Sequence, residues 1–219
     1  MSKKILIIVE GYTEESFVKN VLNKYYYAKE IFLIPTIITT KKNLAGPNYK
    51  GGVSSYNQVK NDLLPLFNDT SASIITTMID YYAIPDDFPG FNEKPESDCF
   101  KRVEFMEEKF SVDVNWERFV PYLQLHEFEA LIFASAANLS SVFIGETKHI
   151  KQVELINNKF KSPEEINENL QSAPSKRLIS IFPAYQKTFH SNLILSNIKV
   201  DDLRGKCPHF NSWLTTLES

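Results

Sequence analysis

The chain has 219 residues and a formal net charge of −3, with 43% hydrophobic and 23% charged residues. This composition is typical of a globular protein and excludes the collagen-like and low-complexity classes. Proteins that hold nucleic acid by bulk charge are usually basic, so a nucleic-acid contact would need a local basic patch, a bound cation or a partner. Its apolar runs are too short for a transmembrane helix, and its two cysteines lack zinc-site spacing. We therefore expect a cytoplasmic protein without membrane contact.

Strands alternate with helices over the first two thirds of the chain. In chain order we first expect a strand at 4–9, a helix from about 13 to 26 capped by Thr13, a strand at 31–39 and a loop at 41–54. A helix at 55–67, a strand at 73–79 and an irregular Pro-rich stretch come next. A helix at about 98–110, a strand at 119–125 and a helix in HEFEALIF complete this part of the chain. This alternation predicts an α/β fold with a mostly parallel, Rossmann-like sheet flanked by helices.

The last third of the sequence is mainly helical. Helices are expected at about 148–160, 163–170, 175–183 and 208–218. No Gly-, Ser- or Pro-rich linker separates this part from the rest. We therefore expect an α/β domain over residues 1–140 and a helical C-terminal extension over residues 141–219 that packs on the same domain.

Acidic residues follow three of the predicted strands. They are Glu10, Asp80, Glu127 and Glu129. Ligands of parallel α/β sheets bind beyond the carboxyl ends of the strands, so these acids are expected at one edge. Glu14 and Glu15 lie in the first turn of a predicted helix, where the helix dipole favours carboxylates without any site.

Clustered carboxylates repel one another, and burial raises their pKa, but a divalent cation removes both costs. Carboxylate oxygens suit Mg²⁺ or Mn²⁺, which also bind phosphate oxygens. Glu127 and Glu129 would lie about 200° apart on a helix, so both can face one cation only in an extended or first-turn conformation. Two roles are open for His126: contact with a phosphate or a carboxylate, and a purely structural role.

Several stretches resemble a known family. They are VEGYTEESF, TTMIDYYAIPDDFPG, PYLQLHEFEALIF, APSKRL and CPHFNSWL. The first two resemble the Toprim fold of topoisomerases, bacterial primases and nucleases of the overcoming-lysogenization-defect type. The set as a whole resembles a bacterial group of Toprim-like proteins. The resemblance implies a Toprim-like fold and metal-dependent cleavage of nucleic acid, DNA or RNA. It also implies a partner ATPase, because such proteins are often found beside ATPases in phage-defence loci.

The resemblance also assigns roles to matching positions. Glu10 matches the Toprim glutamate, a general acid or base that also touches metal, and Asp80 matches the first acid of Asp-x-Asp, a metal ligand. Tyr82 stands at the second acid of that motif, so the motif itself does not supply the second carboxylate of a two-metal site. The missing ligand would come from Asp86, Asp87, Glu127 or Glu129, and the two glutamates are favoured because they follow a strand directly.

Lys176 and Arg177 form one of the few concentrated basic spots, at a helix start after Pro174 and Ser175. A solvated helix start explains them equally well, but the resemblance favours phosphate contact. The leading hypothesis is a Mg²⁺- or Mn²⁺-dependent nuclease with Glu10 and Asp80 as catalytic residues. Two alternatives stay open: a non-catalytic Toprim-like binding module, and a nucleotidyl or phosphoryl transferase that acts on a small nucleotide.

Overall fold

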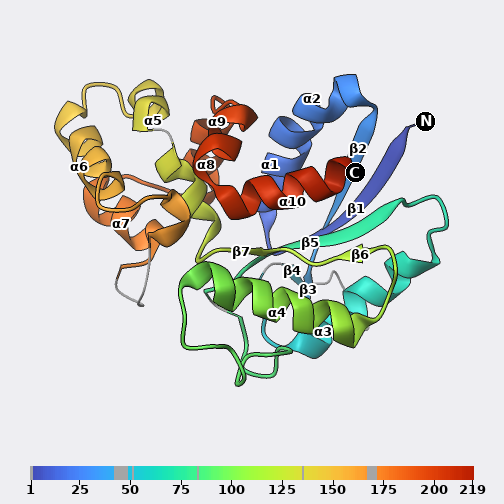
Figure 1. Ribbon diagram of the computed structural model, residues 1–219. Helices are drawn as coiled ribbons and strands as arrows, with labels where there is room; N and C mark the ends of the chain where they lie inside the picture. Colours follow the sequence, from blue (N-terminus) through green and yellow to red (C-terminus); the bar gives the residue numbers. More distant parts are fainter. Residues whose placement is uncertain (1, 42–48, 51, 83, 135, 167–171) are drawn as a thin grey trace. The chain divides into compact units, whose positions relative to one another are not determined.

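The computed structural model describes residues 2–41, 49–50, 52–82, 84–134, 136–166 and 172–219 (Figure 1). The chain divides into two compact units, Met1–Gln124 and Leu125–Ser219. This division lies before the boundary at residue 140 that the sequence suggested. The reason is that the 3-10 helix Phe128–Ala134 packs against helical segments that follow it in the chain.

The first unit is built on a parallel sheet. Its strands are β1 (Lys3–Val9), β2 (Ile31–Ile37), β5 (Ile74–Asp80), β6 (Phe119–Val120) and β7 (Leu123–Gln124). They are arranged in the order β2-β1-β5-β6, and β7 also pairs with β5. Every pair in this sheet is parallel. The predicted mostly parallel α/β sheet is therefore confirmed.

The central strands are buried on both faces, as their unbroken apolar runs indicate. All seven residues of β5 are buried, and so are the last five residues of β1. Burial of apolar side chains on both faces contributes about 25 cal/mol for each Å² removed from water. These two strands form the core that positions the residues after Val9 and Ile79.

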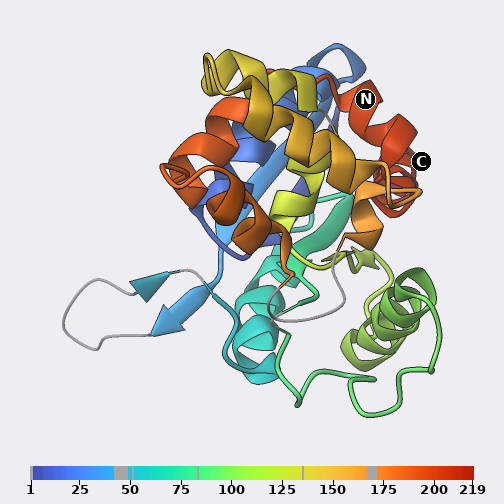
Figure 2. The same ribbon diagram turned by 90° about the vertical axis from the view of Figure 1, so that its left-hand side faces the viewer.

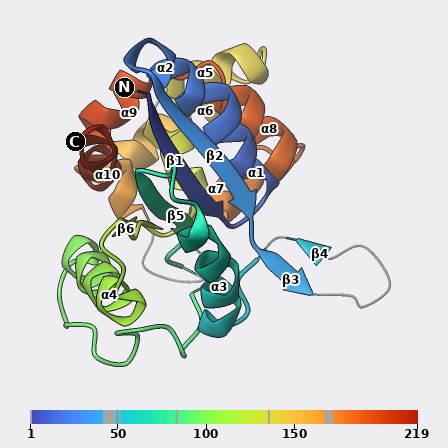
Figure 3. The same ribbon diagram turned by 90° about the vertical axis from the view of Figure 1, so that its right-hand side faces the viewer.

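Helices cover both sides of this sheet (Figures 1 and 3). The helical segments are α1 (Tyr12–Phe17), a π-helical turn (Val18–Leu22), α2 (Asn23–Tyr26), a 3-10 turn (Tyr27–Lys29), α3 (Tyr56–Leu63) with a 3-10 extension (Leu64–Asn68), and α4 (Cys99–Val114). In the two views α1 and α2 lie on one side and α3 and α4 on the other. The helix expected near residue 13 has Gly11, not Thr13, as its N-cap.

The strand expected at 119–125 is interrupted, forming β6 and β7. Pro121 has no backbone N–H to donate, so it cannot continue a ladder. The hydroxyl of Thr77 fills the gap: it donates to the carbonyl of Tyr122 at 2.9 Å and accepts from the Tyr122 amide at 3.0 Å. A buried threonine in β5 thus replaces the missing strand contacts.

A short antiparallel pair, β3 (Thr39–Lys41) with β4 (Tyr49–Lys50), follows β2. It projects from the rest of the first unit (Figure 2). The strand expected at 31–39 therefore ends at Ile37, and pairing resumes at Thr39 in a separate sheet. Part of the loop expected at 41–54 lies outside the described residues.

The second unit is helical where it is described. Its elements are the 3-10 helix Phe128–Ala134, α5 (Ala136–Val142), α6 (Thr147–Asn157), the 3-10 turn Pro163–Glu165, α7 (Pro174–Ile181), α8 (Lys187–Leu195), α9 (Val200–Lys206) and α10 (Pro208–Glu218). The helix expected at 163–170 is a 3-10 turn as far as Glu165, and residues 167–170 lie outside the described part. No helix among the described residues is long and apolar enough to cross a bilayer.

The HEFEALIF stretch is not the α-helix that its spacing suggested. His126 has φ 62°, a left-handed conformation, and a 3-10 helix then runs through Phe128–Ala134. All seven residues of this 3-10 helix are buried, so the segment has no solvent face. The helix expected in HEFEALIF is therefore a 3-10 helix that is buried on all sides.

Candidate functional site

Glu10 and Asp80 lie side by side where β1 and β5 end. The two strands pair in parallel with Val9 opposite Met78, so both chains leave the sheet at the same edge. The backbone amide of Glu10 donates to the Met78 carbonyl at 3.2 Å, and the amide of Asp80 donates to Oε2 of Glu10 at 3.0 Å. An acid at the end of a buried strand is thus tolerated because a backbone N–H of the neighbouring strand stabilises its charge.

The two acids differ in exposure. The side chain of Glu10 is half-buried, whereas Asp80 is only 7% exposed. Glu10 therefore meets solvent, and Asp80 is held deeper at the strand end. A half-exposed carboxylate beside a buried one is suited to exchanging a proton with water while the buried group binds a cation.

Gly11 and Glu14 complete the turn after β1. Glu14 is 5% exposed, and its Oε2 atom lies 3.1 Å from the position that a Cβ atom on Gly11 would occupy. A larger residue at position 11 would therefore press on this carboxylate. Glu15 has no place in the site, as its position in the first turn of a helix suggested, because it pairs with Lys19 at 2.7 Å on the surface. The burial of Glu14 was missed, since no local signal distinguishes the two glutamates.

Asp87 has a structural partner in the same unit. Its two carboxylate oxygens accept from the Tyr56 amide at 2.9 and 3.0 Å, which caps the start of α3. The side chain of Tyr82 is half-buried and follows Tyr81, whose amide donates to Gln124 at 2.9 Å. Burial raises the pKa of Tyr81, although nearby Arg102 acts in the opposite direction.

Glu127 belongs to the second unit, where it caps a helix. Its Oε2 accepts from the Ser175 amide at 2.8 Å and its Oε1 from the Ser175 hydroxyl at 3.0 Å. Ser175 is the second residue of α7, and Pro174 is the first. The carboxylate therefore satisfies an orphan amide of the helix start and meets its positive dipole. The same helix start was expected to bind phosphate.

Glu129 lies in a buried polar group of the second unit. The residue is 0% exposed, and its Oε2 is 3.1 Å from Nζ of Lys187. Ser191 donates to its Oε1 at 3.5 Å, and the hydroxyls of Tyr185 and Ser191 are 2.5 Å apart. Burial, and next the Glu129 charge, raise the pKa of Tyr185. Glu129 thus has a cation and a hydroxyl as partners within its own unit.

Lys176 and Arg177 lie in the first turns of α7. Lys176 is exposed, whereas Arg177 is half-buried and its Nε donates to the Ser172 carbonyl at 2.6 Å. Of the two, Lys176 is thus the better placed to meet a ligand from solution. His126 is 4% exposed and takes the left-handed turn before the 3-10 helix.

No three His, Cys, Asp or Glu side chains gather as a metal site in the part of the chain that the structure describes. The structure does bring the Glu10 carboxylate against the backbone of Asp80, at the end of the neighbouring strand. Two carboxylates are the usual protein contribution to a Mg²⁺ site, in which water and substrate phosphates complete the coordination. The donor set of this edge therefore fits a hard divalent cation that binds together with a phosphate-containing substrate.

A family model described as "Domain of unknown function (DUF4276)" matches residues 9–218 of the chain. No curated protein matches the sequence, and no solved structure does either. The match starts at the last residue of β1 and ends in α10, so it includes both units.

Proposed function

The chain belongs to the DUF4276 family, and we propose that its first unit is a metal-dependent phosphodiesterase that cleaves nucleic acid. The observation that carries this proposal is the contact between the Asp80 amide and Oε2 of Glu10, at 3.0 Å, where two parallel strands end. Substrates of parallel α/β sheets bind at this kind of edge. The Toprim resemblance of VEGYTE and of the strand that ends in Asp80 supports the same chemistry.

Glu10 and Asp80 would hold a Mg²⁺ or Mn²⁺ ion. When bound, such an ion neutralises charge on the scissile phosphate and lowers the pKa of a coordinated water. Glu10 takes the proton of the attacking water as a general base, because its half-buried carboxylate reaches solvent. The Asp80 amide orients this carboxylate through the bond to Oε2. Lys176 and Arg177 would contact backbone phosphates of the substrate. Glu127 and Glu129 have partners within the second unit, Ser175 and Lys187, so this proposal does not need them as metal ligands.

The proposal is tested by Glu10→Gln and Asp80→Asn in the full chain. Each variant is incubated with Mn²⁺ or Mg²⁺ and with single-stranded DNA, duplex DNA or RNA. Both are expected to lose cleavage while keeping the circular dichroism spectrum and melting temperature of the wild type. Glu15→Gln is the matched control, since the side chain of that half-buried glutamate pairs only with Lys19 among the interactions described for it. Full cleavage by both site variants would refute the assigned roles.

Tyr82, in place of a second Asp, favours a different candidate, a non-catalytic module that binds nucleic-acid ends or a partner. Loss of the second acid removes one charge that a two-metal site needs. This module would show no cleavage and no melting shift with either cation. A nucleotidyl or phosphoryl transferase would use the same acids, and product formation from nucleotides separates it from a nuclease.

The setting of this activity rests on the Toprim resemblance alone. We propose that the protein acts in the cytoplasm with a partner ATPase, in defence against phage. An ATPase that forms a complex with the purified protein is expected to change its cleavage rate. A rate that is the same with and without the ATPase would argue against this partnership.

A further inference from the structure

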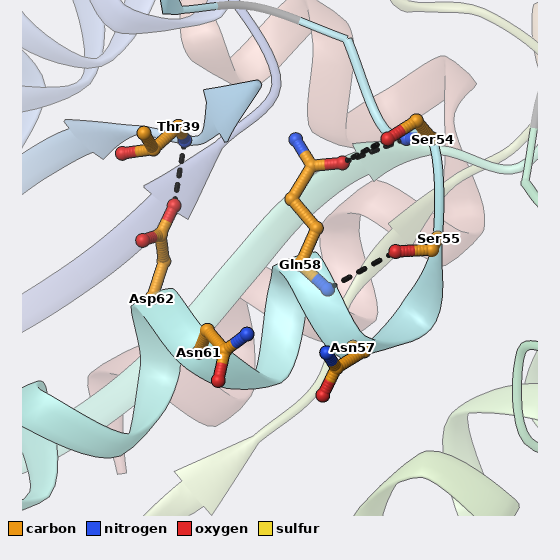
Figure 4. Close-up of a pocket in the computed structure, with 7 residues that line it drawn as sticks. All are labelled: Thr39, Ser54, Ser55, Asn57, Gln58, Asn61 and Asp62. Carbon is orange, nitrogen blue, oxygen red and sulfur yellow. Dashed lines mark hydrogen bonds between the residues drawn. The ribbon is translucent and has the colours of Figure 1, made fainter. Parts of the chain in front are cut away.

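A pocket of about 240 Å³ lies beside α3, and polar residues line it (Figure 4). They are Thr39, Ser54, Ser55, Asn57, Gln58, Asn61 and Asp62. Lys and Arg are missing from these described lining residues, so the pocket does not have the chemistry of a phosphate site. Pockets for drug-sized ligands begin at about 300 Å³. This pocket therefore suits one small, polar, uncharged group.

Two of the lining side chains are held by the backbone. Oε1 of Gln58 accepts from the amide and hydroxyl of Ser54 at 2.8 and 2.7 Å, and its Nε2 donates to the Gly52 carbonyl at 3.0 Å. The amide of Thr39 donates to Oδ2 of Asp62 at 2.6 Å (Figure 4). These bonds fix the walls in place before a ligand arrives, which reduces the entropy lost on binding.

Asn57 and Asn61 are one turn apart on the exposed face of α3. Neither side chain has a hydrogen bond to another residue in the described part of the chain. Each therefore offers a donor and an acceptor to a ligand. Amide side chains read the edges of nucleobases through paired hydrogen bonds, and a carboxylate such as Asp62 accepts from an exocyclic amine.

The pocket adjoins the carboxylate edge of the sheet. The Gly52 amide donates to the Glu10 carbonyl at 3.2 Å, and the Gly52 carbonyl accepts from Gln58 in the pocket wall. Thr39 follows β2, whose residue Ile37 pairs with Val9 of β1. One residue, Gly52, thus joins the pocket wall to the backbone of the proposed general base.

We propose that this pocket binds an unpaired base of a single-stranded nucleic acid whose backbone passes Glu10 and Asp80. The inference rests on the proposed function, because it names the substrate class of that site. A base can enter the pocket lined by Asn57, Asn61 and Asp62 only when it is unpaired and unstacked, so single strands bind in preference to duplexes. The pocket adds base preference, and the carboxylate edge acts on the backbone.

The test uses the full chain in EDTA, so that no cleavage is needed for the readout. Fluorescence anisotropy measures binding of labelled single strands of A, C and T and of one duplex. Asn57→Ala and Asn61→Ala are each expected to weaken binding of the preferred single strand about tenfold and to flatten the preference among bases. Asn92→Ala, an exposed asparagine of the same unit outside the pocket, is expected to bind as the wild type does.

Two outcomes would overturn the inference: equal affinity for all bases in the wild type, or unchanged base preference in both asparagine variants. Chemical-shift mapping with free nucleosides and with glucose adds a second readout, and a response of Asn61 to glucose alone would assign the pocket to sugars. Failure of the base-binding proposal can be distinguished from failure of the proposed nuclease function. Loss of cleavage in Asp80→Asn tests the carboxylates with the pocket intact, and base preference in EDTA tests the pocket without catalysis.

Discussion

Glu127 holds the start of α7 through two hydrogen bonds to one residue, the amide and the hydroxyl of Ser175, at 2.8 and 3.0 Å. Glu164 does the same for α10: its oxygens accept from the amides of His209 and Phe210, both at 2.9 Å. Each helix begins with a proline, whose missing N–H removes one orphan donor. Two of the stretches that resemble the Toprim-like group, APSKRL and CPHFNSWL, are therefore helix starts capped by distant glutamates.

Glu127→Ala is expected to lower the free energy of unfolding by about 1–3 kcal/mol, because the Ser175 amide and hydroxyl lose their buried acceptor. Urea denaturation of the full chain measures this change. Glu154→Gln, an exposed glutamate on α6, is the matched control and should leave the midpoint in place. A Glu127→Ala protein as stable as the wild type would show that the cap contributes nothing.

Mn²⁺ and Mg²⁺ are expected to raise the melting temperature of the wild type. A ligand at 100 times its Kd stabilises the folded state by about 2.7 kcal/mol. The double variant Glu10→Gln with Asp80→Asn should show no such shift, since it lacks both charged ligands. Differential scanning fluorimetry with and without EDTA provides the measurement. An equal shift in the double variant would place the cation elsewhere in the chain.

Lys187→Met is expected to destabilise the protein by about 1–3 kcal/mol, because Glu129 is fully buried and loses its cation. The loss of stability is smaller than for a fully buried ion pair, because solvent screens the half-exposed Lys187 side chain. Adding Glu129→Gln should recover part of the loss, because the buried charge is then removed. Lys159→Met, at an exposed position of the same unit, serves as the control in thermal denaturation.

Asp69 makes stability depend on pH in the acid range. A hydrogen bond from Lys4 at 2.6 Å, and next one from Ser71, lower the pKa of this carboxyl from 3.8 to about 2. Because the folded-state pKa is depressed, the contribution is fully present above pH 3.8 and is lost as the pH falls towards 2.

Asp69→Asn should therefore be less stable than the wild type at pH 7, and the difference should shrink between pH 4 and pH 2. Urea midpoints at several pH values provide the measurement. A difference that stays constant over this range would mean that Asp69 stabilises the fold without its charge.

Lys176→Ala is expected to weaken nucleic-acid binding equally for all sequences and to reduce the slope of log K against log salt by about 1. Glu127 already occupies the amide of Ser175, so the contribution comes from the lysine charge and not from the helix start. Lys151→Ala on α6, also exposed, is the control. An unchanged slope would remove Lys176 from the interface, and Arg177 would follow because its Nε is engaged by Ser172.

The sheet was predictable because its signals are local. Unbroken apolar runs mark β1 and β5 as strands buried on both faces, and parallel pairing then places Glu10 and Asp80 at one edge. The interruption after Val120 also has a local signal, Pro121. The expectation of one unbroken strand at 119–125 did not take this proline into account. The contact between Oε2 of Glu10 and the Asp80 amide needs the register of two strands 70 positions apart.

Other features depend on partners that no local pattern identifies. Glu127 follows a strand and looks like an edge ligand, but its partner Ser175 is 48 positions further along the chain. Glu14 and Glu15 are adjacent and chemically alike, yet only Glu14 is buried. The segment from Phe128 to Ala134 is a fully buried 3-10 helix where an ordinary helix was expected. Long-range packing determines the burial and the partners of these residues, and the spacing of residues in the sequence does not reveal it.

The caps on α7 and α10 join residues separated by 48 and 45 positions. Neither can form until the intervening chain has closed into a loop, and closing a loop of that length costs entropy before any contact repays it. The two caps are non-local contacts although the helices that they cap form from local ones. The caps are therefore expected to form after the first turns of α7 and α10 during refolding.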